Sequence, residues 1–377
     1  MAAYTTIDDP SAYFQVLTYT GNGSNPRNLT NDGNSDLKPD WIWGKNRTDA
    51  GSNHASQISN LSMDAPTYNT QVSPDNSSNA NSPATTYGYC SAFLTDGFTA
   101  AAGGTNGDVY NANGKEFVAW QWKCNGGNVA NNTDGNTTTS VQVNSTAGFS
   151  IGTYAGNSYN GNSIGHGLGA IPDFFMIKGY SGPGTKYWIV GCPNIPSMAN
   201  GASKILYLDL PDAVTNDTST WGNVNLTDTI VTINSGQYVN HVNSNYMFFA
   251  FKNIQGYSKV GEYKGNGNAN GTFVYTGFKP AWVMIKRTDS ADSWAIFDNK
   301  RSDSGGFNVI DKHLRADSTS AELDPGGSPA AQIDILSNGF KQREANGQLN
   351  ASGGTYMYMA FAENPFVTST GIPATAR

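Results

Sequence analysis

Three divergent copies of one sequence pattern follow one another along this chain. In each copy a Pro is followed by a small or acidic residue, an aromatic residue, mostly apolar residues and a Lys. The phrase occurs as PDWIWGKNR at 39–47, PDFFMIKGY at 172–180 and PAWVMIKRT at 280–288. An internal repeat constrains the fold more than any other feature, because each copy must form a similar structural unit.

Further landmarks keep near-constant distances from this phrase. Upstream lie TYTGNG at 18–23, TYAGNS at 153–158 and EYKGNG at 262–267, whose Tyr stands 20, 18 and 17 residues before the Pro. Downstream lie FVAW at 117–120, FFAF at 248–251 and YMAF at 358–361, whose Ala stands 80, 78 and 80 residues after the Pro. TDGF at 95–98 and SNGF at 337–340 mark the outer copies only, and the middle copy has TIN near 232–234 instead. These ordered landmarks predict three tandem units.

The composition favours strands over helices within each unit. Charged residues make up 14% of the chain, against about 25% in a typical soluble protein. The chain holds 43 Gly and 43 Asn, residues that tolerate the left-handed backbone of tight turns. We therefore predict an all-β protein of three tandem, divergent β-sandwich units of jelly-roll-like form.

The landmarks also set the expected boundaries. Unit one spans 1–124 and begins with a segment outside the repeat, which we predict to serve attachment. Residues 125–147 have almost no bulky apolar side chain and predict a polar linker. Unit two spans 148–253, and unit three spans 254–377 with a C-terminal tail. We also expect a long surface loop over 48–86 and a short helical turn over 311–317.

Equivalent residues should occupy equivalent places in the three units. We expect the aromatic residues Trp41, Phe174 and Trp282 to be buried on matching strands. Lys45, Lys178 and Lys286 each end that apolar strand. Two interpretations of these lysines stay open: a strand-end charge in solvent, which is favoured, and a ligand site.

Charge and hydropathy exclude several partners. The net charge is −7 and no basic stripe is visible, so nucleic acid is not an expected partner. No apolar run reaches the roughly 18 residues of a membrane span, and the start lacks the features of a secretory signal peptide. The three cysteines imply no disulfide framework. Buried free thiols are favoured, and a bond between Cys90 and Cys124 is the alternative.

No motif predicts an enzyme. GFSIG at 148–152 fits a nucleophile elbow in letters, but no helix pattern follows it. GHGLG at 165–169 and GNGNANG at 265–271 open no helix that could hold a phosphate, so they predict turns. The four histidines lack metal-ligand spacing. We therefore predict no catalytic residue, no metal ligand and no cofactor site.

Aromatic residues set among Ser, Gly and Asn are the candidate contact residues. Tyr with these small polar residues is the composition of binding loops. Packing at unit edges or against neighbouring chains is the favoured alternative. The candidates for surface contact are Tyr68, Tyr87, Tyr110, Tyr159 and Trp221.

The repeat also carries a resemblance. The series YTGNG, LKPDWIWGKNR, LTDGF and KEFVAWQWK of unit one is similar to a repeat in virion proteins of tailed bacteriophages, common among marine phages. Unit three, with FVYTGFKPAWVMIKR and YMYMAFAENPF, resembles the same family. The resemblance implies a non-enzymatic virion surface protein, a tail-fibre or host-recognition component assembled in the host cytoplasm. The alternatives are a capsid decoration or head-fibre protein and, disfavoured by the motif search, a polysaccharide depolymerase.

The same resemblance implies the partners. These would be other virion proteins, further copies of the chain in a homo-oligomer, most simply a trimer, and a glycan or protein on the host surface. It implies neither nucleic-acid binding nor membrane insertion.

Overall fold

The computed structural model describes residues 3–59, 71–80, 86–104, 109–199, 204–221, 226–302, 308–323 and 331–373. Every pairing between its named strands is antiparallel, and its named helical elements are η1 (Pro10–Ala12) and α1 (Gly347–Asn350). The all-β prediction is confirmed. The helical turn expected over 311–317 is wrong, because Leu314 and Arg315 form a short strand that pairs with Ala295 and Ile296.

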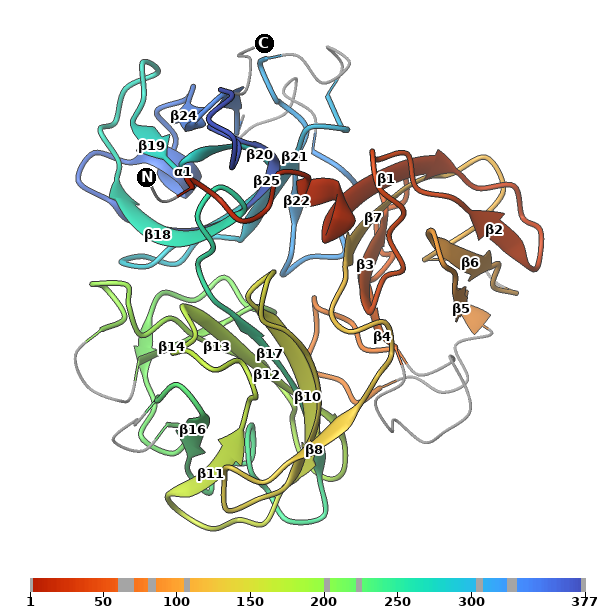
Figure 1. The fold of residues 1–377 in the computed structure, drawn as a ribbon, viewed down its shortest axis with the longest axis vertical. Coiled ribbons are helices and arrows are strands. Elements are labelled where there is room, and N and C mark those ends of the chain that lie inside the picture. Colours follow the sequence, from red (N-terminus) through yellow and green to blue (C-terminus); the bar gives the residue numbers. More distant parts are fainter. Residues whose placement is uncertain are drawn as a thin grey trace.

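Each third of the chain supplies one large and one small sheet (Figure 1). In unit one, the order β1 (Phe14–Thr20), β7 (Glu116–Trp122), β3 (Trp41–Asn46), β4 (Ala55–Ile58) forms the large sheet. The order β2 (Arg27–Leu29), β6 (Phe98–Ala101), β5 (Tyr89–Phe93) forms the small one. A buried cluster that includes Leu29, Ile42 and Phe98 fills the space between them.

Unit two has the largest sheet. Its order is β15 (Thr215–Asn216), β14 (Lys204–Tyr207), β13 (Trp188–Gly191), β12 (Phe174–Ser181), β17 (Asn245–Phe251), β10 (Phe149–Ala155), β9 (Thr139–Asn144), β8 (Ala130–Asn132). The small sheet pairs β11 (Asn162–Gly165) with β16 (Ile230–Ile233). The predicted linker is therefore wrong over β8 and β9. Its polar composition concealed two strands: β9 pairs with β10 and buries Val141, and β8 pairs with β9.

Unit three repeats the plan. Its large sheet has the order β18 (Ser258–Lys264), β25 (Thr355–Pro365), β20 (Phe278–Arg287), β21 (Ala295–Asp298), β22 (Leu314–Arg315). Its small sheet has the order β19 (Phe273–Tyr275), β24 (Gly339–Gln342), β23 (Ile333–Leu336). The turns TDGF and SNGF connect β5 to β6 and β23 to β24, as their Asp-Gly and Asn-Gly pairs favour.

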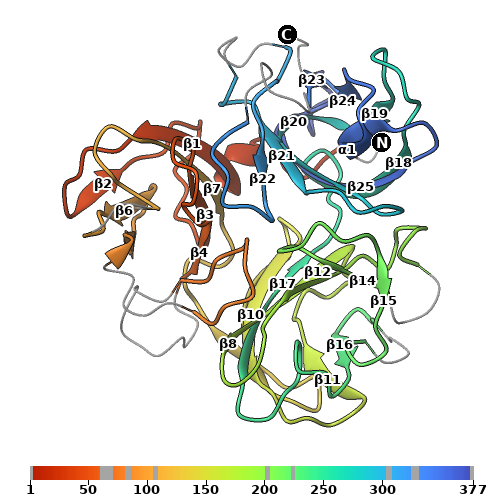
Figure 2. The ribbon, with the colours of Figure 1, turned by 180° about the vertical axis from the view of Figure 1, so that it is seen from behind.

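The three large sheets face one another around a common core (Figures 1 and 2). Strand register shows the equivalences, since Trp41 pairs with Trp122, Phe174 with Phe251 and Trp282 with Phe361. All six side chains are at least 97% buried in this one cluster. The expected burial of Trp41, Phe174 and Trp282 in matching places is confirmed.

The register also corrects one landmark. Ala250 pairs with Phe175 and Ala360 with Val283, each one residue after the core aromatic of the phrase. In unit one, the residue in that place is Gln121, which pairs with Ile42, rather than Ala119. The FVAW phrase of unit one is therefore displaced by two residues from its apparent counterparts.

The N-terminal segment, residues 3–12, lies along unit three. Thr5 donates its hydroxyl to the Gln255 carbonyl at 2.8 Å, and the Ser369 amide donates to the Asp8 carboxylate at 2.6 Å. Ile7 is buried in the common core. The segment thus joins unit one to unit three, and a role in attachment to another protein stays a prediction.

Candidate functional site

The candidate aromatic residues fall into two groups. Tyr87 and Tyr159 are 48% and 72% exposed, on units one and two respectively. Tyr110 and Trp221 are 0% and 3% exposed, so their expected surface position is wrong. Tyr68 lies outside the described residues.

Local packing explains both burials. The Tyr110 ring contacts Phe98 edge to face and lies so close to Gly44 that a Cβ there would stand 3.2 Å from it. Trp221 packs edge to face on Phe175, over Gly191. In both places a glycine of the large sheet leaves room for a ring. The polar residues next to Tyr110 and Trp221 in the sequence do not indicate this contact.

The three equivalent lysines are buried, which corrects their expected solvent position. Lys45, Lys178 and Lys286 are each 0% exposed. The Lys178 ammonium donates to the carbonyls of Lys186 at 2.6 Å and Asn76 at 3.0 Å, and Lys286 donates to those of Asp292 at 2.6 Å and Pro211 at 2.9 Å. Asn76 belongs to unit one and Pro211 to unit two, so these lysines hold neighbouring units together.

A second set of contacts connects the units in a circle. The Trp188 indole of unit two donates to the Ser73 carbonyl of unit one at 2.9 Å, and the Trp294 indole of unit three donates to the Tyr207 carbonyl of unit two at 2.8 Å. The equivalent residue of unit one is His54, whose Nε2 lies 2.9 Å from the Arg315 carbonyl of unit three. The units therefore close a ring.

The loop expected over 48–86 takes part in this closure. Its described residues include β4 and the segment 71–80, and Val72, Ser73 and Asp75 are buried. The expectation of a surface loop is wrong for these residues, because Ser73 and Asn76 supply carbonyls to unit two.

An aspartate caps each contact of the circle. The backbone amides of His54, Trp188 and Trp294 donate to Asp75 at 3.2 Å, Asp209 at 3.1 Å and Asp317 at 3.0 Å. Burial raises the pKa of Asp75 to about 7 and of Asp209 to about 6. Burial also lowers the pKa of Lys178 to about 7 and of Lys45 and Lys286 to about 8. Perturbed pKa values often mark reaction centres. Here Lys178 and Lys286 each bind a carbonyl of the preceding unit, Lys45 binds carbonyls of its own unit, and the aspartates bind the amides of the residues that contact a neighbouring unit.

The junction between units one and three differs from the other two, because no linker joins them in sequence. The Arg301 guanidinium contacts Asp298 and Glu322, each at 2.6 Å, and Arg47 of unit one contacts Glu322 at 2.7 Å. The Trp120 indole donates to Asp298 at 2.9 Å. Charged side chains at the centre of the interface thus close the ring where the chain does not.

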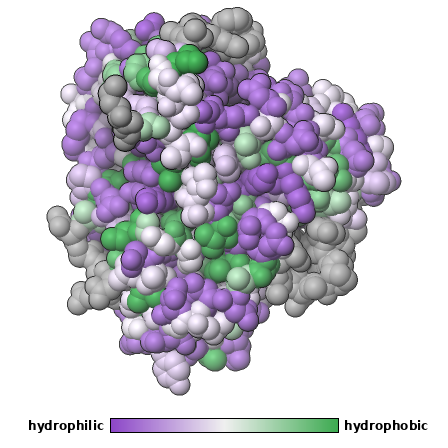
Figure 3. Space-filling model, in the orientation of Figure 1, coloured by the Kyte–Doolittle hydropathy of each residue, from purple (hydrophilic) through white to green (hydrophobic). Residues whose placement is uncertain are grey.

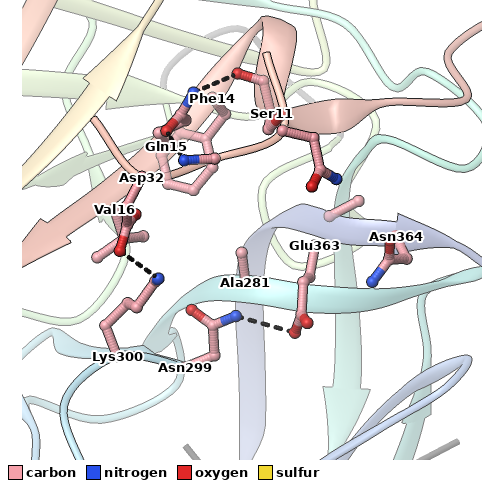
Figure 4. A pocket seen from close by; sticks show the side chains of 13 residues that line it. Ser11, Phe14, Gln15, Val16, Asp32, Ala281, Asn299, Lys300, Glu363 and Asn364 are labelled. Atoms are coloured by element: carbon pink, nitrogen blue, oxygen red, sulfur yellow. Dashed lines mark hydrogen bonds and ion pairs between the residues drawn. The ribbon is translucent and has the colours of Figure 1, made fainter. Parts of the chain in front are cut away.

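An open pocket of about 280 Å³ lies at this same junction. Figure 4 shows unit-one residues, among them Phe14, Gln15 and Val16, across an open space from Ala281 and Asn299 of unit three. Lys300 and Asp32 form an ion pair across it at 2.9 Å. The other lining residues are Ser11, Gly33, Asn34, Ala362, Glu363 and Asn364.

The polar groups of the pocket contact one another. Asn299 donates its amide to Glu363 at 2.9 Å, and Glu363 also contacts the Lys279 ammonium at 2.7 Å. The lining residues come from five separate stretches of the chain, so no single sequence motif could predict the pocket.

Metal-ligand groups, cysteines and long apolar helices were also sought among the described residues. Among them no group of three or more His, Cys, Asp and Glu side chains is placed to hold a metal ion. Cys90, Cys124 and Cys192 are buried and unpaired, as favoured from the sequence. No helix in the described ranges has the length and hydrophobicity needed to cross a membrane.

Comparison with known proteins gives a family. No curated protein and no solved structure matches the chain. Residues 9–365 match the model of DUF7483, a domain of unknown function. The match covers all three units and the last residues of the N-terminal segment, so the chain belongs to the DUF7483 family.

Proposed function

We propose that this protein is a non-enzymatic surface component of a bacteriophage virion, in the tail-fibre or host-recognition apparatus. The observation that carries the proposal is the closed ring of three units around one core. Its buried ionisable groups serve the contacts between units, which suits a rigid particle component. The assignment to a phage particle rests on the sequence resemblance to phage virion proteins.

We further propose that each unit is a β-sandwich of jelly-roll-like form. The large and small sheets of each third enclose a cluster of their own, which supports the sandwich. The proposal includes assembly on other virion proteins and contact with a host glycan or protein. The exposed Tyr87 and Tyr159 are the aromatic candidates for such contacts.

One observation favours the alternative of a capsid decoration or head-fibre protein. The units lie side by side in a triangle rather than end to end (Figure 1), whereas a fibre shaft needs an elongated arrangement. The face seen in Figure 3 is mostly hydrophilic, with hydrophobic residues gathered toward its middle and over unit two. A compact body with such a face suits a component that sits on a particle surface.

Labelling intact particles tests the proposal. Antibodies raised against the folded chain would be bound to phage particles whose genome encodes it and located by electron microscopy. Label at the tail supports the first assignment, and label over the head supports the alternative. Particles that lack the chain by mass spectrometry, while the lysate contains it, would overturn both.

Mass measurement of the purified chain tests the proposed homotrimer separately. Because one chain already places three units around one axis, a trimer would contain nine units. A monomer at high concentration would leave any further symmetry to the particle.

A further inference from the structure

The first strand of each unit presents one edge to the preceding unit in the ring. These strands are equivalent by register, since their first pairs are Phe14 with Trp122, Phe149 with Phe251 and Ser258 with Phe361. Val16, Ile151 and Val260 therefore occupy the same place, and all three are buried in the common core. The backbone groups on these three edges nevertheless have different hydrogen-bond partners.

In unit two a whole strand covers the edge. β9 pairs with β10, and Gln142 lies opposite Ile151. The Gln142 amide then reaches across to unit one and donates to the Ser59 carbonyl at 2.6 Å. One residue thus completes the sheet and joins two units.

In unit three one side chain replaces that strand. The Val260 amide donates to the Asn253 side-chain oxygen at 2.6 Å, and the Asn253 side-chain nitrogen donates to the Val260 carbonyl at 3.2 Å. An Asn amide carries one acceptor and two donors, so it can imitate a paired peptide group. The edge is again satisfied from within the chain.

In unit one no described strand pairs with the same edge and no described side chain bonds to it at Val16. The Lys123 amide donates to the Tyr13 carbonyl, so in this antiparallel ladder the odd residues of β1 bond to β7. The backbone N–H and C=O of Val16 therefore point the other way, toward the pocket that Phe14, Gln15 and Val16 line. Among the described residues no hydrogen bond reaches these two groups. Unpaired edge groups are a template for strand pairing.

The opposite wall of the pocket contains a residue equivalent to Ser59, the residue whose carbonyl Gln142 binds. Ser59 follows the pair of Trp41 with Ile58 and donates its amide to the Asp40 carbonyl at 2.8 Å. Asn299 follows the equivalent pair of Trp282 with Asp298 and donates to the Ala281 carbonyl at 2.9 Å. Asn299 is therefore the counterpart of Ser59, and it lines the pocket across from Val16 (Figure 4).

We propose that the edge of β1 binds an extended segment of a partner protein by antiparallel strand addition. The segment pairs its main chain with Val16, as β9 pairs with Ile151. It carries a Gln or Asn opposite Val16 that donates to the Asn299 carbonyl, with β-branched residues on both sides as in β9. Strand addition takes affinity from the main chain and specificity from alternate side chains.

The β9 sequence itself provides the probe. A capped peptide Thr-Ser-Val-Gln-Val-Asn, residues 139–144, would be titrated into the full chain while the Val16 amide is followed by hydrogen exchange or NMR. We expect saturable binding with a dissociation constant on the order of 1 mM and slower exchange at Val16. A rigid partner protein would bind more tightly, because its segment is already extended.

Backbone methylation of the peptide gives a control that leaves the protein unchanged. Methylating the Gln nitrogen removes the N–H that faces Val16, so binding should weaken at least about tenfold. Methylating the nitrogen of the Val after the Gln alters an N–H that points away, so binding should persist. Equal binding of both methylated peptides, or no binding at several millimolar, would overturn the proposal.

Two other occupants are separate outcomes. If the peptide-free chain dimerises and its Val16 amide becomes protected as it does so, a second copy fills the edge and the proposed partner is wrong. The second occupant is a simple sugar. If a sugar displaces the peptide, and neither sugar nor peptide slows hydrogen exchange of the Val16 amide, the pocket binds its ligands through side chains. Strand addition is then wrong.

Discussion

The junction between units one and three and the junction between units two and three perform the same task with different chemistry. At the linked junction of units two and three, the Trp294 indole and the Lys286 ammonium bind backbone carbonyls of unit two. At the unlinked junction a chain of buried and largely buried ion pairs is added, formed by Arg301, Asp298, Glu322 and Arg47. Where a covalent linker keeps two units close, neutral acceptors suffice. Where no linker joins the two units, ion pairs lie at the interface.

The largest expected effect comes from removing the central charge of the unlinked junction. Arg301→Ala leaves the buried Asp298 without its ion-pair partner and leaves Glu322 with Arg47 alone, and a buried charge left alone costs about 3 to 5 kcal/mol. Denaturant unfolding would measure this loss. Arg287→Ala is the control, since its ion pair with Asp289 is partly exposed and should contribute less than about 1 kcal/mol. If both variants lost the same unfolding free energy, the buried ion pairs would not distinguish the unlinked junction.

A smaller loss is expected from the N-terminal segment at the same junction. Ile7→Ala opens a cavity in the common core and should cost about 2 to 3 kcal/mol in the free energy of unfolding. Tyr4→Phe removes only outer hydroxyl contacts with Tyr275 and Gly277 and should change stability by less than about 0.5 kcal/mol. If Ile7→Ala were neutral, the segment would not help to close the ring.

The linked junctions can be probed through one hydrogen bond. Trp188→Phe leaves the Ser73 carbonyl without its donor and should cost about 1 to 2 kcal/mol more than Trp282→Phe. Trp282 is an apt control, because its buried indole nitrogen has no hydrogen-bond partner among the described residues. Thermal or denaturant unfolding of the two variants gives the difference, and no difference would mean that this indole contributes only by packing.

A different kind of effect is a pH dependence carried by the buried lysines. Burial lowers the pKa of Lys178 from 10.5 to about 7, so between these values the folded chain binds fewer protons than the unfolded chain. Stability should therefore rise with pH from about 7 to 10.5. Burial raises the pKa of Asp209 from 3.8 to about 6, so this group makes stability fall as pH rises from 3.8 to 6.

Lys178→Met should remove the part of the upper slope that this lysine carries. The comparison is between the pH profiles of unfolding free energy for the two proteins, with Lys115→Met as the partly exposed control. A Lys178→Met profile that still rises as steeply as that of the parent would assign the slope to other groups.

The sequence predicted the repeated features and missed those that depend on neighbours. Trp41, Phe174 and Trp282 were correctly expected in equivalent buried places, because aromatic residues flanked by apolar ones on a strand need a core. The equivalence of Lys45, Lys178 and Lys286 was also visible, but their burial was not. The carbonyls that bind Lys178 and Lys286 include Asn76 and Pro211 of the preceding unit, and local patterns do not show such contacts.

The candidate site was hidden for the same reason. β9 looked like linker because pairing with β10 satisfies its main chain whatever its side chains are. The open edge of β1 became recognisable only beside its two filled counterparts. Among the aromatic candidates, Tyr110 and Trp221 were misplaced because glycines on facing strands make room for their rings.

Fusing the three units into one chain has a consequence for valency. Three identical subunits around an axis would present three identical strand edges, and any partner would be bound three times. In this chain the copies have diverged: β9 pairs with one edge, Asn253 bonds to another, and among the described residues no hydrogen bond reaches Val16 on the third. Under the proposed strand addition, this threefold framework binds its partner once, and the bound edge distinguishes unit one from the other two units.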